Sequence, residues 1–265
     1  MLKIIGVSLI GLTHKKEGEK LQDFFNIYVS NLYASIDSLI SDEAIARGFE
    51  GDGIALVLVA DGAGSVKYGG DGAKYAVNSA IEFVKNKNLI NEASDEVLKG
   101  ILKAALESVR HGASVLNASI EDLSTTFMAL YVKDHECSLA SIGDGYVIID
   151  DGSELKLLNV PIKGEYFNET QFITSPEIVK AIEDGSIEVR RSRCNAFAVT
   201  TDGLWPTVIN GKPYEKFYRP IIDYLRGNDT SKVIDELLNL LKSIQEKYPS
   251  AYDDDLTIVV GAYEQ

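Results

Sequence analysis

The pattern of apolar and polar positions divides the chain into strand-like and helix-like segments. Short apolar runs rich in β-branched residues and bounded by polar turns are typical of β-strands. The charged residues 14–20 predict a loop, whereas 35–52 are ambiguous, with either a short helix at about 37–47 or a loop excursion. The predicted strands cover residues 3–12, 24–32, 56–60, 125–132, 137–142, 146–149, 155–158, 196–201 and 256–260.

Apolar residues recur with a helical period in longer segments. The predicted helices cover residues 70–87, 94–117, 214–226 and 230–247, with a shorter helix at 176–183. Helices therefore come in pairs and strands in runs, which differs from the strict alternation of a doubly wound parallel sheet. This order predicts an α+β fold in which antiparallel β-sheets pack together and helix pairs cover the outside.

No repeat, linker or low-complexity segment divides the chain, so we expect a single domain over residues 1–265. Residues 160–193 interrupt the succession of predicted strands and helices, and they contain Pro161, Pro176 and the polar run 168–171. A loop-rich insertion of this length is often a functional flap. A surface insertion without a functional role is an equally good interpretation.

Composition narrows the class of protein. The net charge of −14 disfavours a general nucleic-acid binder, because contacts to phosphates need a basic face. Cys137 and Cys194 are too few for a disulfide framework, and we expect two buried free thiols. The N-terminus lacks the apolar region of a signal peptide, and no apolar run approaches the ~18 residues of a membrane span. These features predict a cytoplasmic protein without a membrane partner.

Acidic residues stand at the ends of several predicted strands. Asp61, Asp144 and Asp202 each follow a predicted strand, whereas the acidic run 253–255 precedes one. One strand followed by Asp-Gly is an ordinary turn, but the repetition indicates one shared site for a hard cation. Mg²⁺, Mn²⁺ and Ca²⁺ prefer oxygen ligands, and two such ions ~3.5–4 Å apart can activate water and clamp a phosphoryl group. The sequence contains no Walker loop, Gly-x-Gly-x-x-Gly motif or EF-hand loop.

Six short motifs carry a resemblance to a known family. They are Gln22-Asp23, Val59-Ala60-Asp61-Gly62-Ala63-Gly64, Ser124-Thr125-Thr126, Ile142-Gly143-Asp144-Gly145, Thr200-Thr201-Asp202-Gly203-Leu204-Trp205 and Asp254-Asp255-Leu256-Thr257. In this order they resemble the metal-dependent PPM/PP2C serine/threonine protein phosphatases of the bacterial and archaeal branch. The resemblance implies a four-layer αββα sandwich. It also implies hydrolysis of phosphoserine and phosphothreonine in phosphorylated proteins by a two-metal-activated water, opposite a cognate Ser/Thr kinase.

The resemblance also implies roles for individual residues. The implied metal ligands are Asp23, Asp61, the carbonyl of Gly62, Asp144, Asp202 and Asp254. Asp61 would bridge two Mg²⁺ or Mn²⁺ ions, and Asp23 would orient the attacking water. Asp144 would bind a third, more weakly held ion. For each acid, the alternative role is that of a turn or cap residue.

The chain departs from the family pattern near its phosphate-binding position. Gly18 stands where family members usually carry an Arg, five residues before Asp23. The candidate replacements are His14, Lys15, Lys16 and Lys20. His14 is the most interesting, because an imidazole can donate to phosphate or to the leaving oxygen near neutral pH. The alternative is a solvated loop histidine. In addition, Ala63 replaces a His that some eukaryotic relatives use as general acid.

Two other functions remain open from the sequence. A catalytically weak or silent relative could act as a sensor or partner-binding module through the same fold, and a hydrolase of small phosphate esters could use the same acids. A silent relative would be expected to lose metal ligands, but Asp23, Asp61, Asp202 and Asp254 are all present. Their presence favours the enzyme, while Gly18 leaves the nature of the substrate open.

Overall fold

The computed structural model describes residues 1–87, 94–159 and 170–264. The first part of the expected flap, residues 160–169, therefore lies outside the described residues. Within the described ranges, ten strands form one sheet in which every pairing is antiparallel, in the order β7-β6-β9-β12-β1-β3-β4-β5-β8 with β2 alongside β3. The strands are β1 (Leu2–Leu9), β2 (Asp23–Ile40), β3 (Ala44–Asp61), β4 (Phe127–Lys133), β5 (Glu136–Ile142), β6 (Tyr146–Asp150), β7 (Leu155–Leu157), β8 (Arg190–Arg193), β9 (Ala196–Thr200) and β12 (Leu256–Tyr263).

The long hairpin of β2 and β3 joins the two layers of this sheet. The first half of β3 pairs with β1, its second half pairs with β4, and β2 follows it with three register shifts. The prediction of a short helix or loop within 35–52 is therefore wrong. Most side chains between 31 and 37 are exposed at the outer edge of the hairpin. A solvent-facing strand has the same polar composition as a loop, and this explains the error.

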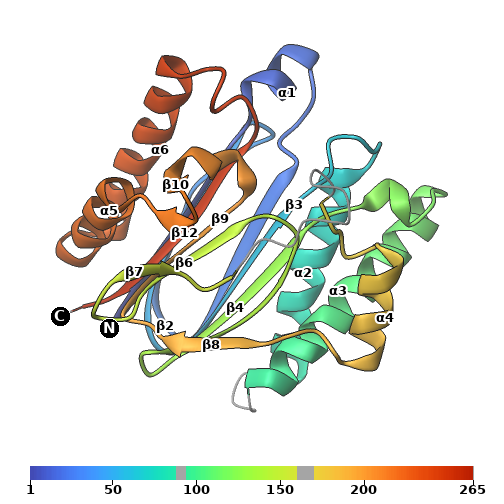
Figure 1. Ribbon diagram of the computed structural model, residues 1–265, viewed down its shortest axis with the longest axis horizontal. Helices are drawn as coiled ribbons and strands as arrows, with labels where there is room; N and C mark the ends of the chain where they lie inside the picture. The colour runs from blue at the N-terminus through green and yellow to red at the C-terminus, as the bar shows by residue number, and fades with distance from the viewer. Residues whose placement is uncertain (88–93, 160–169, 265) are drawn as a thin grey trace.

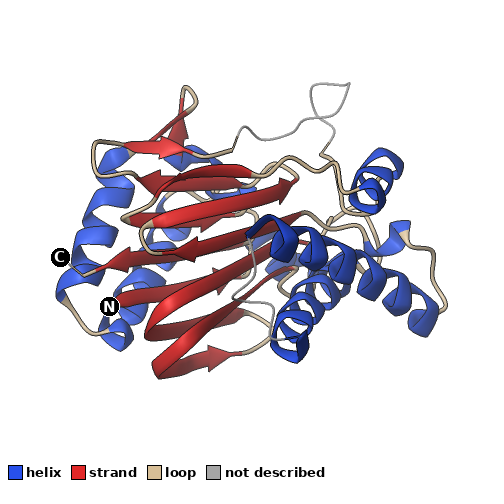
Figure 2. Cartoon of the chain, turned by 90° about the horizontal axis from the view of Figure 1, so that it is seen from below, coloured by secondary structure: helices blue, strands red, loops and turns tan. Residues whose placement is uncertain are grey.

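Helices cover both faces of the folded sheet (Figure 1). They are α2 (Gly69–Lys87), α3 (Ser94–Leu116), α4 (Pro176–Asp184), α5 (Glu215–Gly227) and α6 (Thr230–Lys247). The short helix α1 (Leu12–Glu17) has no buried residue and lies at one end of the strands (Figure 1). Figure 2 shows the strands with helices on either side, as in an αββα sandwich. The expected helix pairs are confirmed as α2 with α3 and α5 with α6, and α4 lies against α3.

Among the described residues, three hydrophobic cores account for the four layers. One core lies between the two sheet layers and contains Phe25, Val57 and Phe197. The second lies beneath α2, α3 and α4, and the third beneath α5 and α6. Close packing between the layers requires glycine at two positions. A Cβ on Gly6 would lie 2.3 Å from the Phe25 ring, and one on Gly261 would lie 2.2 Å from Phe197. The predicted layer order is thus confirmed, with the two sheet layers continuous through β2 and β3.

Several local predictions are also resolved. The prediction of a charged loop at 14–20 is wrong for residues 14–17, which belong to helix α1; the helix is capped by Gly18 with φ 75°. A single exposed helical turn buries no apolar face, so it has the polar composition of a loop. The described part of the 160–193 insertion contains helix α4 and the unpredicted strand β8, which pairs with β5. Cys137 and Cys194 are free and buried, as expected. Within the described residues, no helix is both long and apolar enough to span a bilayer.

Candidate metal centre

The strand pairing brings the predicted acids to one end of the sandwich. Asp23 at the start of β2 lies opposite Asp61 at the end of β3. Thr200, two residues before Asp202, is the partner of both Ile258 on β12 and Tyr146 on β6. In antiparallel neighbours, the start of one strand adjoins the end of the next. Asp144 before β6 and Asp254 before β12 therefore meet Asp202 after β9.

A cavity of about 180 Å³ lies where these strand ends converge. Six of the predicted site residues line it: His14, Asp61, Gly62, Asp144, Asp202 and Asp254. Asp23 does not line the cavity and is buried beside Asp61. Gly62 is fixed by close backbone approach, because a Cβ there would lie 2.2 Å from the carbonyl carbon of Gly69. The structure thus brings all the predicted acids together, with Asp23 behind the others.

Burial and neighbouring negative charges raise the pKa values of Asp61 and Asp202. Burial raises the pKa of Asp61 well above its usual range, and the charges of Asp23 and Asp202 raise it further. The pKa of Asp202 is raised to about 6 by burial and by the charges of Asp144 and Asp254. Like charges at short range disfavour the ionised forms. A bound cation would reverse this effect, because it favours the charged carboxylates.

The environment of Asp23 provides a test of whether the site fits a cation. Its Oδ2 accepts a hydrogen bond from the Thr201 hydroxyl at 2.7 Å. Its Oδ1 is buried and has no hydrogen-bond partner among the described residues. Burial, followed by the charge of Asp255, raises the pKa of Asp23 well above its usual range. An unpartnered buried carboxylate oxygen is costly, and a cation or an ordered water at this place would satisfy it. The donor set, which consists of carboxylate oxygens, fits a hard divalent cation.

Asp255 is a site residue that the sequence analysis missed. It is 3% exposed, and each of its oxygens accepts two hydrogen bonds. Oδ1 accepts from the backbone N–H of Gly11 at 2.6 Å and from Nδ1 of His14 at 2.9 Å. Oδ2 accepts from the backbone N–H groups of Gln22 at 2.6 Å and Asp23 at 3.2 Å. The available signal was the Asp at 255 in the terminal motif, where the family pattern has Asn.

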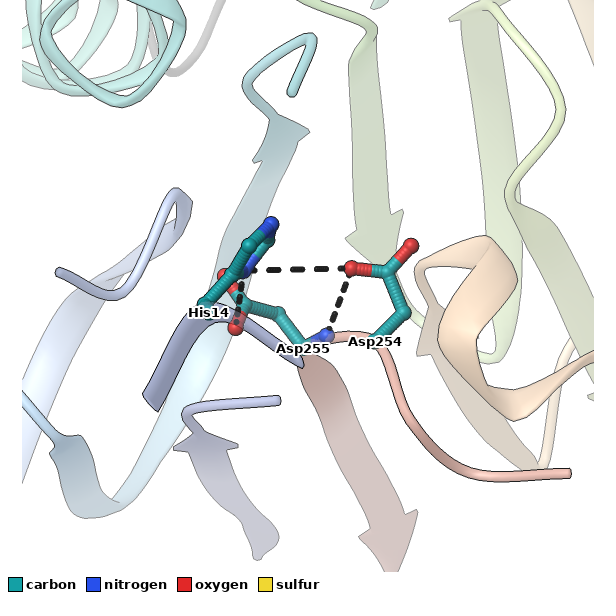
Figure 3. A group of neighbouring side chains, drawn as sticks. All are labelled: His14, Asp254 and Asp255. Atoms are coloured by element: carbon teal, nitrogen blue, oxygen red, sulfur yellow. Dashed lines mark hydrogen bonds and ion pairs between the residues drawn. The ribbon is translucent and has the colours of Figure 1, made fainter. Parts of the chain in front are cut away.

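His14, Asp254 and Asp255 form a compact group (Figure 3). Their potential ligand atoms all lie within 4.8 Å of one another, and the Nδ1 of His14 is 4.0 Å from Oδ1 of Asp254. The hydrogen bond to Asp255 raises the pKa of His14 to about 9, against the opposing effect of burial. The four hydrogen bonds that Asp255 accepts hold α1 and the start of β2 against β12. Asp254, and not Asp255, lines the cavity.

The structure separates the candidate replacements for the missing Arg. Gly18 ends α1 in the left-handed region, which disfavours a side chain such as Arg there. Lys15 pairs with Glu43 at 2.8 Å and Lys20 with Asp42 at 3.1 Å. Of the four candidates, only His14 lines the acidic cavity.

We expect Asp255→Asn to lower the free energy of unfolding by about 1–3 kcal/mol, because an amide cannot accept all four hydrogen bonds. The loosened start of β2 should also weaken Mn²⁺ binding through Asp23. Urea unfolding and Mn²⁺ titration by calorimetry measure the two effects. Asp253→Asn is the matched control, because it removes the same charge from an exposed neighbour. Equal behaviour of the two variants would contradict the positioning role of Asp255.

Comparison with known proteins gives a consistent result. A sequence model of the protein phosphatase 2C family matches residues 10–239. The chain is 30% identical over 220 residues to "Serine/threonine-protein phosphatase 3" of Escherichia coli (strain K12), which covers 79% of this chain and 84% of that protein. Two solved structures share the fold. A bacterial serine phosphatase has a TM-score of 0.67 at 15% identity, over 98% of this chain and 97% of the other. The serine/threonine phosphatase Stp1 from Staphylococcus aureus has a TM-score of 0.65 at 16% identity, over 100% and 96%.

Proposed function

The chain belongs to the protein phosphatase 2C family, and from this premise we propose that it is a metal-dependent phosphatase acting on phosphoserine and phosphothreonine in proteins. One observation supports this most directly. Four acids from separate strand ends, Asp61, Asp144, Asp202 and Asp254, line one cavity, and Asp23 is the strand partner of Asp61. A single domain, a cytoplasmic location and a cognate Ser/Thr kinase remain predictions from the sequence.

We propose that the centre holds two Mg²⁺ or Mn²⁺ ions, with Asp144 serving a third. The proposed ligands are Asp23, Asp61, the carbonyl of Gly62, Asp144, Asp202 and Asp254. Such ions stabilise charge on phosphoryl oxygens and lower the pKa of water at the site. Thr170 donates its hydroxyl to Oδ2 of Asp144 at 2.5 Å. This hydrogen bond fixes the orientation of the Asp144 carboxylate at the cavity wall.

The chain's own residues would then orient the reactants. Asp23 is buried behind the cavity, so its role would be to hold a cation or orient a water through Oδ1, which has no hydrogen-bond partner among the described residues. His14 is bound to Asp255 through Nδ1, which leaves Nε2 as the donor available to a phosphate in the cavity. Nε2 lies 3.8 Å from the Glu19 carboxylate, so an arriving phosphate would compete with that contact.

The decisive assay is Mn²⁺-dependent release of phosphate from a phosphothreonine peptide. We expect activity with Mn²⁺, none with EDTA, and a lower rate for a phosphotyrosine peptide. Hydrolysis of p-nitrophenyl phosphate without hydrolysis of phosphopeptides would instead support a small-ester hydrolase. Metal binding without hydrolysis of any phosphate ester would support a silent sensor or partner-binding module.

His14→Ala should raise KM for a phosphopeptide or lower kcat by about tenfold, because it removes the cationic donor from the cavity. His135→Ala is the matched control: its Nδ1 also makes a 2.9 Å hydrogen bond, to Asn195, but the residue is exposed and does not line the cavity. Steady-state kinetics at saturating Mn²⁺ compare the two variants. Indistinguishable kinetics would show that His14 has no role in phosphate binding, and Lys16 would be tested next.

A further inference from the structure

One large apolar side chain stands among the acids of the metal centre. Of the described residues that line the acidic cavity, Phe172 is the only one with a large hydrophobic side chain. The others carry a carboxylate, a hydroxyl or an imidazole, or they are glycine and alanine. A phenyl ring can neither hold a divalent cation nor donate a hydrogen bond to a phosphate. The chemistry proposed above therefore gives Phe172 no role.

Phe172 has no role in the hydrophobic cores either. Within residues 1–87, 94–159 and 170–264, it belongs to none of the three. Its neighbour Ile173 is fully buried in the core beneath α2, α3 and α4, whereas Phe172 is half-buried at the cavity wall. An aromatic ring that lies outside the cores and lines a polar site is a candidate for contact with a ligand.

Hydrogen bonds hold the backbone of Phe172 in a fixed place beside Asp61. Its N–H donates to the hydroxyl of Ser175 at 3.0 Å, and its carbonyl accepts from the N–H of Ser175 at the same distance. The N–H of Ile173 donates to the carbonyl of Thr125 at 2.9 Å. The hydroxyl of Thr125 in turn donates to the carbonyl of Asp61 at 2.8 Å. The position of Phe172 relative to the proposed metal ligands is therefore set before a substrate arrives, which lowers the cost of binding.

A phosphorylated serine or threonine brings a small apolar group into the cavity next to its phosphate. Both residues carry the β-carbon of the ester, and phosphothreonine adds a methyl group on that carbon. Because the cavity has a volume of only about 180 Å³, a phosphate held by the acids keeps this carbon near the walls. We propose that Phe172 is a specificity-determining residue whose ring contacts the methyl group and favours phosphothreonine over phosphoserine. This inference rests on the proposed phosphatase function and concerns the substrate preference of the same site.

Two peptides that differ only in carrying phosphothreonine or phosphoserine test the proposal. The wild-type protein should hydrolyse the phosphothreonine peptide with a kcat/KM about fourfold higher, the factor that burial of one methyl group supplies. Phe172→Ala should equalise the two values, because the contact with the methyl group is lost. Phe172→Leu, which keeps an apolar side chain at the wall, should retain most of the preference.

Phe217→Ala is the matched control. It removes a half-buried phenyl ring that packs against the core beneath α5 and α6 and does not line the cavity. This control should keep the wild-type preference and lower the Tm, whereas Phe172→Ala should lose the preference with a smaller change in Tm. A merely structural role for Phe172 would give the opposite result, a lower Tm with an unchanged ratio of the two kcat/KM values.

Equal kcat/KM values for the two peptides with wild-type protein, or an unchanged ratio in Phe172→Ala, would overturn the proposal. If Phe172→Ala failed to fold, Phe172→Gln would replace it, because glutamine fills much of the same space with a polar side chain. Failure of the phosphatase function would appear differently, as the absence of metal-dependent hydrolysis of both peptides. Fluorescence anisotropy in Mn²⁺ would then compare their binding. Tighter binding of the phosphothreonine peptide that is lost in Phe172→Ala would support the proposal, and equal binding would contradict it.

Discussion

Asp61→Asn should abolish metal-dependent phosphate hydrolysis while leaving the fold intact. Asp61 is the residue on which the charges of four other acids converge, and it is half-buried at the end of a central strand. A ligand that bridges two cations needs a full negative charge, which the amide of Asn lacks. The side chains have nearly the same shape, so the packing around β3 should persist. We expect at least a 100-fold loss in kcat at saturating Mn²⁺.

The matched control for this prediction is Asp235→Asn, which makes the same substitution at an exposed position of α6. Circular dichroism and thermal unfolding check that both variants remain folded. If Asp61→Asn kept more than a few per cent of the wild-type activity, the loss of transition-state stabilisation would be under ~2 kcal/mol. That result would contradict the bridging role of Asp61.

Millimolar Mn²⁺ at pH 7.5 should raise the Tm by several degrees over the value in EDTA at matched ionic strength. A cation that binds only the folded state stabilises it by RT ln(1 + [L]/Kd), about 2.7 kcal/mol at a hundredfold excess over Kd. For a chain of this size that corresponds to roughly 5–10 °C. The physical source is the acidic cavity, where the raised pKa values of Asp61, Asp202 and Asp254 show that the carboxylates are poorly compensated without a cation.

The same pKa shifts set the pH dependence of the metal-free protein. An acid with a raised pKa in the folded state keeps its proton where the unfolded chain has lost it. For Asp202 this holds between about pH 4 and 6, so the folded state binds more protons there and stability falls as pH rises. His14 acts in the same direction at higher pH, because its stabilising protonation is lost between about 6.5 and 9. The Tm in EDTA should therefore fall from pH 5 to 7.5, and Mn²⁺ should oppose the fall.

Asp61→Asn provides the internal check on this stability prediction. Removing one charge should raise the metal-free Tm and reduce the gain produced by Mn²⁺, whereas Asp235→Asn should leave both unchanged. Differential scanning calorimetry measures the Tm of the wild type and of both variants in EDTA and in Mn²⁺. A Tm that responds neither to Mn²⁺ nor to Asp61→Asn would mean that these acids do not form one metal site.

The sequence alone predicted the αββα layers and the convergence of the acids. Strand ends are local features, and the apolar run before Asp61 and the one before Asp202 each specify where the chain stops being buried. The period of apolar positions also predicted both helix pairs, because a 3.6-residue repeat reflects burial of one helix face whatever lies beneath it. Strand ends and helical periods depend on residues only a few positions apart, so they can be predicted from a single sequence.

Only the tertiary structure decided the features that depend on distant partners. The carboxylate of Asp255 holds Gly11 and Gln22, which are 244 and 233 residues away in the chain. The register that sets Asp23 opposite Asp61, and the single long hairpin that joins both sheet layers, likewise follow from pairing along the whole of β3. A polar stretch has the same composition whether it forms a loop or a solvent-facing strand edge, and the free energy that distinguishes them comes from hydrogen bonds to another strand. The contact between β7 and the hairpin of β10 (Val208–Ile209) and β11 (Lys212–Pro213) is likewise tertiary, because these elements are far apart in the chain.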